Sequence, residues 1–340
     1  MDRPAVIDRY AMGDVYGVRD TLLTYICSEG KSNRLSKADW LPSVAYMKDG
    51  QIRDTLFDSF VILPSPNYLY NYGPSDFGLK PLTKADWLRY ITDEQFAAGV
   101  NLDAVDGAVG DVRRALGKSD YKATIFLSLF YPVKSVASFG EVDGKNLCLA
   151  DPEDRKSAVK WMAEEHIRQF KARNYQHLRL GGFYWYYDAL EADDADMEDI
   201  LDDVTAYIRE RGYITTWLPF FLAPGFDRAH ALGFDLIAMQ ANYFHGPKPN
   251  AGGKDRLAQM DALIKEHQLG VCLELGGDTG ADLDIFKDYL SAGAELGYIH
   301  AYHMYYMGGG PDEVAKLACC DREEIRSGYD GLYNFIKKIL

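Results

Sequence analysis

Eight short apolar runs with strand character recur along the 340-residue chain, and helix-like segments separate them. Strands that alternate with helices predict a parallel sheet, and eight such units predict a (β/α)8 TIM barrel. A doubly wound open sheet is the alternative, but it favours a glycine-rich phosphate loop after its first strand, and CSEGKSNRLS is not one. The eight runs cover residues 19–27, 57–63, 122–130, 177–185, 213–220, 235–243, 270–276 and 298–306.

We expect a single barrel domain over residues 1–340, because the sequence contains no linker and no sign of a second core. The domain should carry a small hairpin, and long loops at its C-terminal face. VAYMKDGQIRD at residues 44–54 predicts the hairpin, with its turn at Asp49 and Gly50. Residues 64–82, rich in Pro, Gly and Tyr, predict a long loop after the second strand.

The net charge of −14 makes nucleic acid and anionic membrane surfaces poor partners, because both are negatively charged as well. No apolar stretch approaches the length of a membrane span, and the first 18 residues lack the apolar core of a signal peptide. We therefore expect a cytoplasmic protein as the sequence is written, or a secreted or periplasmic one if a signal peptide has been removed.

The sequence predicts no metal site and no cofactor. Its five cysteines are an odd number without C-x-x-C spacing, so they form neither a disulfide framework nor a zinc motif. Metal hydrolases on this fold use an H-x-H pair on the first strand, and TLLTYIC has no histidine. The acidic run at residues 191–203 lacks the glycine and final glutamate of a calcium loop, and is typical of a solvated helix N-terminus.

In a TIM barrel the active site lies at the C-terminal ends of the strands. Aromatic, amide, hydroxyl and acidic side chains occupy these ends in the sequence, and basic residues are nearly missing. Sugar rings stack on aromatic side chains, and sugar hydroxyls bond to amides and acids, so the pattern predicts a carbohydrate site. The candidate substrate-binding residues are Glu29, Tyr70, Tyr184, Trp185, Tyr187, Trp217, Gln240, Asn242, Tyr243, Asp278, His303 and Tyr305.

Glu274 is the strongest catalytic candidate. In the strand VCLEL it shares a face with Cys272, whereas Val271, Leu273 and Leu275 form the opposite, wholly apolar face. The apolar face should pack on helices, which directs Glu274 into the mouth of the barrel. The alternative is a structural ion pair, for which Arg179 on the fourth strand would be the partner.

Asp188 is the second catalytic candidate, because it ends the aromatic run FYWYYD just past the fourth strand. Aromatic walls exclude water and raise the pKa of a carboxyl, as a general acid requires. The alternative is that Asp188 only caps the next helix. Glu29, after the first strand, and Asp278, in a glycine-rich loop, are reserve acids.

His303 shares a strand face with Tyr305, so both are candidates for substrate contact, and a core histidine with satisfied hydrogen bonds is the alternative. The loops at residues 276–284 and 307–313 follow the last two strands, where barrels often bind phosphate. Both loops are acidic and contain no Lys or Arg, so they would repel a phosphate group.

Over nearly its full length the chain resembles a bacterial family catalogued as a domain of unknown function and similar to TIM-barrel glycosidases. The residues that carry the resemblance are YGVRDTLLTY at 16–25, GGFYWYYD at 181–188 and VCLELGGD at 271–278. The resemblance implies an acid/base after the fourth strand and a nucleophile after the seventh, the positions of Asp188 and Glu274. Retaining glycosidases of this kind usually have Asn-Glu after the fourth strand, and this chain has Tyr187-Asp188.

These observations together predict a glycoside hydrolase that acts on an oligo- or polysaccharide, with Glu274 as nucleophile or base and Asp188 as acid. A non-catalytic glycan-binding or scaffold protein on a glycosidase-like barrel is the alternative, since a binder needs the aromatic side chains but not two facing carboxylates. A lyase or isomerase of a phosphorylated sugar is a third possibility, disfavoured by the acidic loops.

Overall fold

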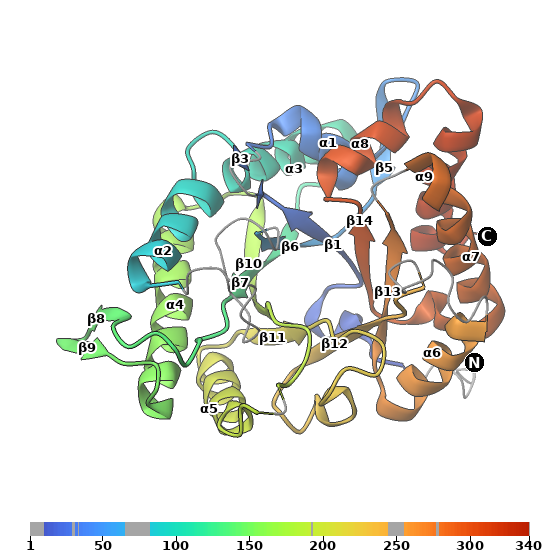
Figure 1. Ribbon diagram of the computed structural model, residues 1–340. Helices are drawn as coiled ribbons and strands as arrows, with labels where there is room; N and C mark the ends of the chain where they lie inside the picture. Colours follow the sequence, from blue (N-terminus) through green and yellow to red (C-terminus); the bar gives the residue numbers. More distant parts are fainter. Residues whose placement is uncertain are drawn as a thin grey trace.

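Eight parallel strands form a closed barrel with helices around it (Figure 1). The structure is a computed structural model that describes residues 10–28, 31–32, 34–64, 82–191, 193–243, 255–276 and 279–339. Each barrel strand pairs with the next one along the chain, and the last pairs with the first, so the TIM barrel is confirmed and the open sheet is excluded. The strands are β1 (Asp20–Tyr25), β6 (Ser59–Leu63), β7 (Ala123–Leu129), β10 (Leu178–Trp185), β11 (Ile214–Trp217), β12 (Leu236–Gln240), β13 (Gly270–Leu275) and β14 (His303–Met307).

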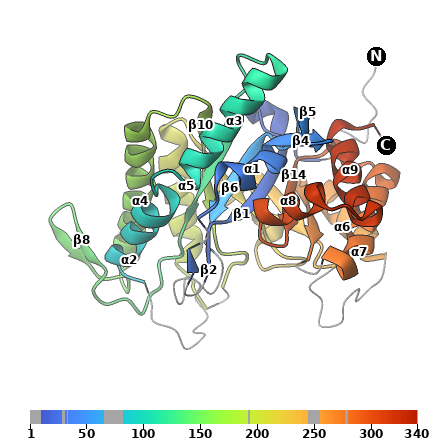
Figure 2. The ribbon, with the colours of Figure 1, turned by 90° about the horizontal axis from the view of Figure 1, so that it is seen from above.

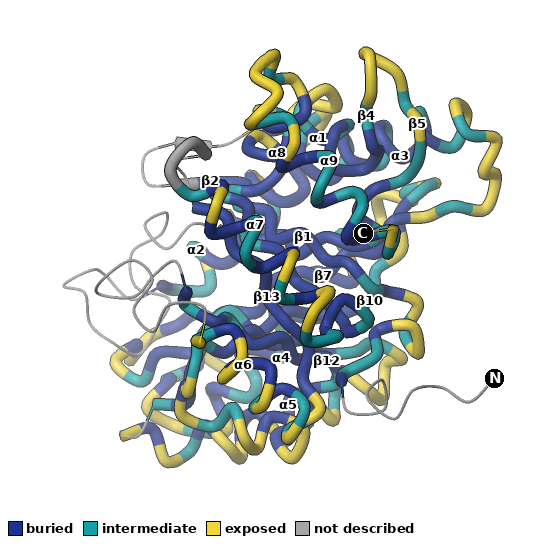
Figure 3. The backbone as a smooth tube through the Cα atoms, turned by 90° about the vertical axis from the view of Figure 1, so that its right-hand side faces the viewer, coloured by how far each residue is buried: buried dark blue, intermediate teal, exposed yellow. Residues whose placement is uncertain are grey.

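The helices follow the strands and cover the outside of the barrel, with their inner sides buried (Figure 3). Two of them begin with a capping box, in which the carboxylate of Asp39 or Asp86 accepts the backbone N–H of Ser36 or Thr83. The α-helices are α1 (Lys37–Val44), α2 (Lys84–Arg89), α3 (Leu102–Leu116), α4 (Pro152–Arg173), α5 (Met197–Glu210), α6 (Asp255–His267), α7 (Thr279–Leu296), α8 (Pro311–Cys319) and α9 (Glu323–Lys337). The short helices are η2 (Gly13–Tyr16), η3 (Tyr90–Gln95, a π-helix), η4 (Phe226–Arg228) and η5 (Tyr298–His300).

The predicted hairpin is present as β4 (Ala45–Lys48) and β5 (Gln51–Thr55), and it leads into the start of a barrel strand (Figure 2). Asp49 and Gly50 turn it with φ angles of 52° and 68°. A second hairpin, β8 (Gly140–Val142) with β9 (Lys145–Leu147), was not predicted, although Asp143-Gly144 at its turn is the same signal. A third short pair, β2 (Cys27–Ser28) with β3 (Lys31–Ser32), follows β1.

Two apolar cores separate the inside of the barrel from its outside. The inner cluster contains alternate residues of every barrel strand, among them Leu23, Phe126, Tyr184 and Cys272. The outer cluster contains the intervening residues, which pack against the helices, among them Val271, Leu273 and Leu275. Because side chains alternate along a strand, this division tells which strand-end side chains face the mouth of the barrel.

The two glycines before the aromatic run allow β10 to lie close to both neighbouring strands. A Cβ atom on Gly182 would lie 1.9 Å from the carbonyl oxygen of Ile214 on β11, and one on Gly181 would lie 2.4 Å from the Thr124 side chain on β7. The register between β10 and β7 shifts at this point. No larger side chain fits at Gly182 without separating β10 from β11.

A buried polar network joins the first and last strands at their N-terminal ends. Asp20 accepts hydrogen bonds from His303 Nδ1 at 3.0 Å and from the Tyr305 hydroxyl at 2.8 Å. Burial would raise the pKa of Asp20, but these bonds and the charge of Arg19 hold it below the usual value. In TIM barrels this end of the strands serves stability rather than catalysis.

Candidate active site at the carboxyl ends of the strands

The aromatic run after Gly182 divides between the two faces of β10. Tyr184 belongs to the inner cluster, Phe183 and Trp185 belong to the outer one, and Tyr186 packs against both. The Tyr186 hydroxyl donates to the carbonyl oxygen of Pro64 at 2.9 Å, which holds the ring at the mouth. Only every second ring of the run can therefore contact a molecule in the barrel mouth.

Glu274 lies on the inner face at the end of β13, level with Tyr306 of β14, and only 1% of it is exposed. Its Oε2 accepts a hydrogen bond from the Tyr289 hydroxyl on α7. Its Oε1 is buried and has no hydrogen-bond partner in the described part of the chain. Arg179 is not its partner, because that guanidinium bonds to Thr124 Oγ1 at 2.6 Å and to backbone carbonyls of η2 and Gly17.

The turn after β12 brings two backbone N–H groups towards this carboxylate. Asn242 has a left-handed backbone, with φ of 48°, so its own N–H and that of Tyr243 lie near Glu274 and stabilise its charged form. Neither N–H reaches Oε1 with hydrogen-bond geometry. The side chain of Asn242 holds the turn by accepting the backbone N–H of Phe221 at 2.8 Å.

Burial raises the pKa of Glu274 from its usual 4.5 to about 7. The bond from Tyr289, the two backbone N–H groups and the positive charge of Arg256 each oppose this rise without cancelling it. A carboxyl with a pKa near neutrality can both give and take a proton at physiological pH.

Asp188 lies just past β10, half-buried, and burial raises its pKa. The nearby charge of Glu191 adds to this rise, and the backbone N–H of Asp188 itself opposes it. The charge of Asp188 helps to raise the pKa of the Tyr184 hydroxyl. The charge of Glu274 likewise helps to raise the pKa of the Cys272 thiol. Each carboxylate therefore acts electrostatically on a side chain of the inner cluster, Asp188 on Tyr184 and Glu274 on Cys272.

Several predicted substrate-binding residues lie instead in the outer cluster. Trp185, Trp217 and Tyr243 are at most 3% exposed there, and Tyr187 packs against the same cluster. Trp217 stacks on Phe234 and donates to a backbone carbonyl at 2.7 Å. Trp185, Trp217 and Tyr243 are therefore too deeply buried to form sugar platforms, which corrects the expectation for these three, whereas Tyr187 remains partly exposed.

His303 and Tyr305 also face the helices, and at most 1% of each is exposed. Both bond to Asp20 in the network at the N-terminal end of the barrel, and His303 Nε2 lies 2.8 Å from the Tyr298 carbonyl. A substrate in the mouth cannot reach them. His303 is the satisfied core histidine that the sequence left as an alternative.

Gln240 is the candidate amide that reaches the mouth. It lies on the inner face at the end of β12, partly exposed, and its Nε2 donates to the Leu218 carbonyl at 3.3 Å. Asn242 is partly exposed as well, but its side-chain oxygen is engaged with Phe221. Three other predicted site residues lie outside the described residues: Glu29, Tyr70 and Asp278.

Three inner-face tyrosines at the mouth were not among the predicted substrate contacts: Tyr25, Tyr186 and Tyr306. All three are partly exposed, and the rings of Tyr25 and Tyr306 meet edge to face at 6.0 Å. Strand alternation could have predicted them, because each lies two positions after a residue that faces the inside of the barrel. Arg256 at the start of α6 was also missed, and it follows no strand directly.

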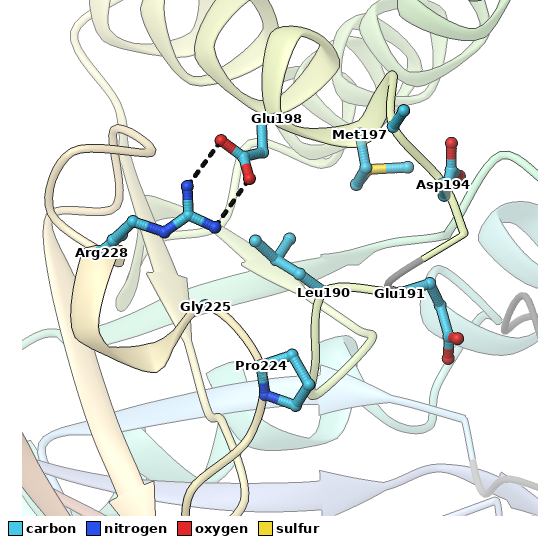
Figure 4. Close-up of a pocket in the computed structure, with 9 residues that line it drawn as sticks. Leu190, Glu191, Asp194, Met197, Glu198, Pro224, Gly225 and Arg228 are labelled. Carbon is cyan, nitrogen blue, oxygen red and sulfur yellow. Dashed lines mark hydrogen bonds and ion pairs between the residues drawn. The ribbon is translucent and has the colours of Figure 1, made fainter.

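A separate pocket of about 260 Å³ lies between the loop before α5 and the loop after β11 (Figure 4). Neither Glu274 nor Asp188 lines it. Arg228 spans its edge with two bonds to the Glu198 carboxylate, of 2.8 and 2.7 Å. These bonds satisfy the one guanidinium among the residues that line it.

Within the described part of the chain, no group of three or more His, Cys, Asp or Glu side chains is arranged to hold a metal ion. In the same part of the chain, no helix is both long and apolar enough to span a bilayer.

Solved structures that resemble the chain include three barrel enzymes. They are the GH18 chitinase ChiB of Flavobacterium johnsoniae (12% identity, TM-score 0.47, 93% of this chain and 94% of that chain), a family 18 chitinase of Crocus vernus (12%, 0.45, 90% and 98%) and the malate synthase of Haloferax volcanii (10%, 0.42, 92% and 78%). A search among curated protein sequences finds no match. Residues 20–334 match a family described as "Domain of unknown function (DUF4855)", and the chain belongs to that family.

Proposed function

We propose that the protein hydrolyses glycosidic bonds with Glu274 and Asp188 as its two carboxyl groups. The observation that carries the proposal is Glu274 itself. It is a buried carboxyl at the mouth of a barrel, with a pKa of about 7 and one oxygen that has no partner among the described residues. Burying a carboxyl without satisfying it costs stability, and proteins retain such groups mainly where they serve chemistry.

The environments of the two carboxyls divide their roles. Glu274, half protonated near neutral pH, suits proton donation to the leaving oxygen of the sugar bond. Asp188 keeps more contact with solvent and serves as the charged partner, either as nucleophile or as base for a water molecule. This assignment reverses the one expected from the sequence, because the deeper burial belongs to Glu274.

The neighbouring inner-face side chains suit a sugar ring. Tyr25, Tyr186 and Tyr306 offer partly exposed aromatic surface, and Gln240 offers an amide. Deeper positions on the inner face, such as Leu23 and Val61, are aliphatic.

The test is hydrolysis of a panel of 4-nitrophenyl glycosides and polysaccharides by the purified protein and its variants. We expect Glu274→Gln and Asp188→Asn to lower kcat by about 10³-fold while folding is retained. Asp58→Asn is the matched control, because Asp58 is a carboxyl with a raised pKa at the other end of the barrel. Its Oδ1 accepts three hydrogen bonds that an amide oxygen preserves.

Full activity of Glu274→Gln would contradict the proposal. Sugar binding by the wild type without turnover of any substrate would support the non-catalytic glycan-binding alternative instead.

A further inference from the structure

Arg256 introduces a positive charge beside the proposed catalytic carboxyl. It is the second residue of α6, and its charge is close enough to Glu274 to lower the pKa of that group. The guanidinium lies 4.2 Å from the centre of the Phe221 ring, and one of its nitrogens, Nη1, donates to the Ala241 carbonyl at 3.1 Å. These two contacts hold the plane of the guanidinium in place.

The remaining donors of Arg256 have no acceptor among the described residues. Its Nε is buried without a hydrogen-bond partner, and no carboxylate in the described ranges lies within ion-pair distance of the guanidinium. A guanidinium presents five N–H donors in a rigid fork that fits a carboxylate at two points. In Arg256, Nη1 donates to a protein carbonyl, and Nε has no acceptor in the described part of the chain.

Glu274 presents the opposite deficit, because no donor in the described part of the chain bonds to its buried Oε1. An unpartnered donor and an unpartnered acceptor thus occur on neighbouring groups of one site, each at a cost of roughly 1–3 kcal/mol. A ligand that carries a carboxylate satisfies Nε, and a nearby hydroxyl on it can donate to Oε1. When Glu274 is protonated, Oε1–H can instead donate to the ether oxygen of a leaving group.

We propose that the sugar bound at this site is a uronic acid, whose carboxylate binds Arg256 while its glycosidic oxygen faces Glu274. The inference rests on the proposed function, since it identifies the substrate class of that same site. The net charge of −14 would repel a long polyanion, so the ligand that fits is a single acidic residue rather than an extended acidic chain.

Binding tests the inference without requiring turnover. Methyl glucuronide and methyl galacturonide are titrated by calorimetry or ligand-observed NMR, with methyl glucoside and methyl galactoside as neutral partners. We expect one uronide to bind at least about tenfold more tightly than its neutral partner, and Arg256→Gln to abolish that preference. Arg228→Gln is the control, because Arg228 is satisfied by Glu198 in the separate pocket, and it should keep the preference.

Arg256→Lys keeps the charge and loses the fork, so it should retain part of the preference and also serves if Arg256→Gln fails to fold. Equal or tighter binding of the neutral sugars by the wild type, binding of none of the four, or a preference that survives Arg256→Gln, would overturn the inference.

Hydrolysis of the matching 4-nitrophenyl uronides and neutral glycosides separates this inference from the proposed function. A uronide preference in binding with no turnover of any glycoside contradicts the catalytic proposal and supports this one. Turnover of neutral glycosides alone supports catalysis and contradicts the uronic acid. If Arg256→Gln lowers kcat equally for both classes and leaves KM unchanged, Arg256 only adjusts Glu274, which also contradicts the inference.

Discussion

The side-chain oxygen of Asn242 accepts the backbone N–H of Phe221 at 2.8 Å, and this bond joins the loop after β11 to the turn after β12. Both segments contain a left-handed residue that is not glycine, with φ of 60° at Leu222 and 48° at Asn242. Such conformations cost free energy and persist where the surroundings enforce them, commonly at functional sites. The bond between Asn242 and Phe221 thus positions two parts of the site. It holds the backbone N–H groups of the β12 turn near Glu274 and the Phe221 ring beneath Arg256.

Replacing Asn242 should separate the hydrogen bond from the backbone strain. Asn242→Gly loses the bond but adopts a φ of 48° easily, whereas Asn242→Ala loses the bond and keeps the strain. We expect the alanine variant to be less stable than the glycine variant by about 1 kcal/mol in urea unfolding. Equal stability of the two would show that the turn is not strained.

The raised pKa of Glu274 should make the protein less stable as the pH rises. The folded state binds this proton more tightly than the unfolded state, so stability falls between pH 4.5 and about 7. The total loss is about 3 kcal/mol, since each pKa unit corresponds to 1.36 kcal/mol. Glu274→Gln cannot ionise, and we expect its unfolding free energy to lack this part of the decline.

The control for that measurement is again Asp58→Asn. Burial and the neighbouring charge of Asp20 raise the pKa of Asp58 to about 6. Removing this carboxyl should therefore reduce the fall in unfolding free energy as the pH rises to about 6, a lower range than for Glu274. A Glu274→Gln curve parallel to that of the wild type above pH 5 would contradict the pKa shift of Glu274.

Tyr289→Phe should raise the pKa of Glu274 further, because it removes a hydrogen bond to the charged form. A bond to a charged group corresponds to about one pKa unit or more, so the proton-dependent limb of kcat/KM should move up by about that amount. Tyr329→Phe is the matched control, since its hydroxyl bonds to the carbonyls of Pro42 and Ala45. Identical profiles for the two variants would argue against a tuning role for Tyr289.

Tyr305 and Tyr306 are adjacent but face opposite sides of β14, so their variants should have different effects. Tyr306→Ala removes aromatic surface at the mouth, and we expect about a tenfold rise in KM for the substrate found in the screen. Tyr305→Phe removes a donor to buried Asp20, and should cost about 1–3 kcal/mol of stability with KM unchanged. A raised KM for Tyr305→Phe with an unchanged KM for Tyr306→Ala would contradict a sugar site on the inner face of β14.

The eight strands could be predicted because each is a short apolar run bounded by helical segments, and the barrel follows from their number and spacing. The direction of Glu274 could be predicted too, since one face of its strand is wholly apolar. The aromatic run gave no such guide: Tyr184 and Trp185 are both apolar and both buried, so hydrophobicity does not reveal which one faces inward.

Arg256 could not be found by examining strand ends, because it reaches the site from the first turn of a helix. Tyr289 reaches the same carboxyl from α7, again by tertiary packing rather than by sequence position. The hydrogen bond between His303 and Asp20 could not be predicted either, since the two residues are 283 positions apart in the sequence.

That separation has a consequence for how the chain is made. β1 is the first barrel strand to be synthesised and β14 is the last, yet only their pairing closes the barrel and gives Asp20 its partners His303 and Tyr305. Until residue 305 has been synthesised, the sheet has two open edges and a carboxylate that burial would leave unpaired. The barrel therefore cannot complete its fold before its last strand has been made, so closure is a late step that joins the two ends of the domain.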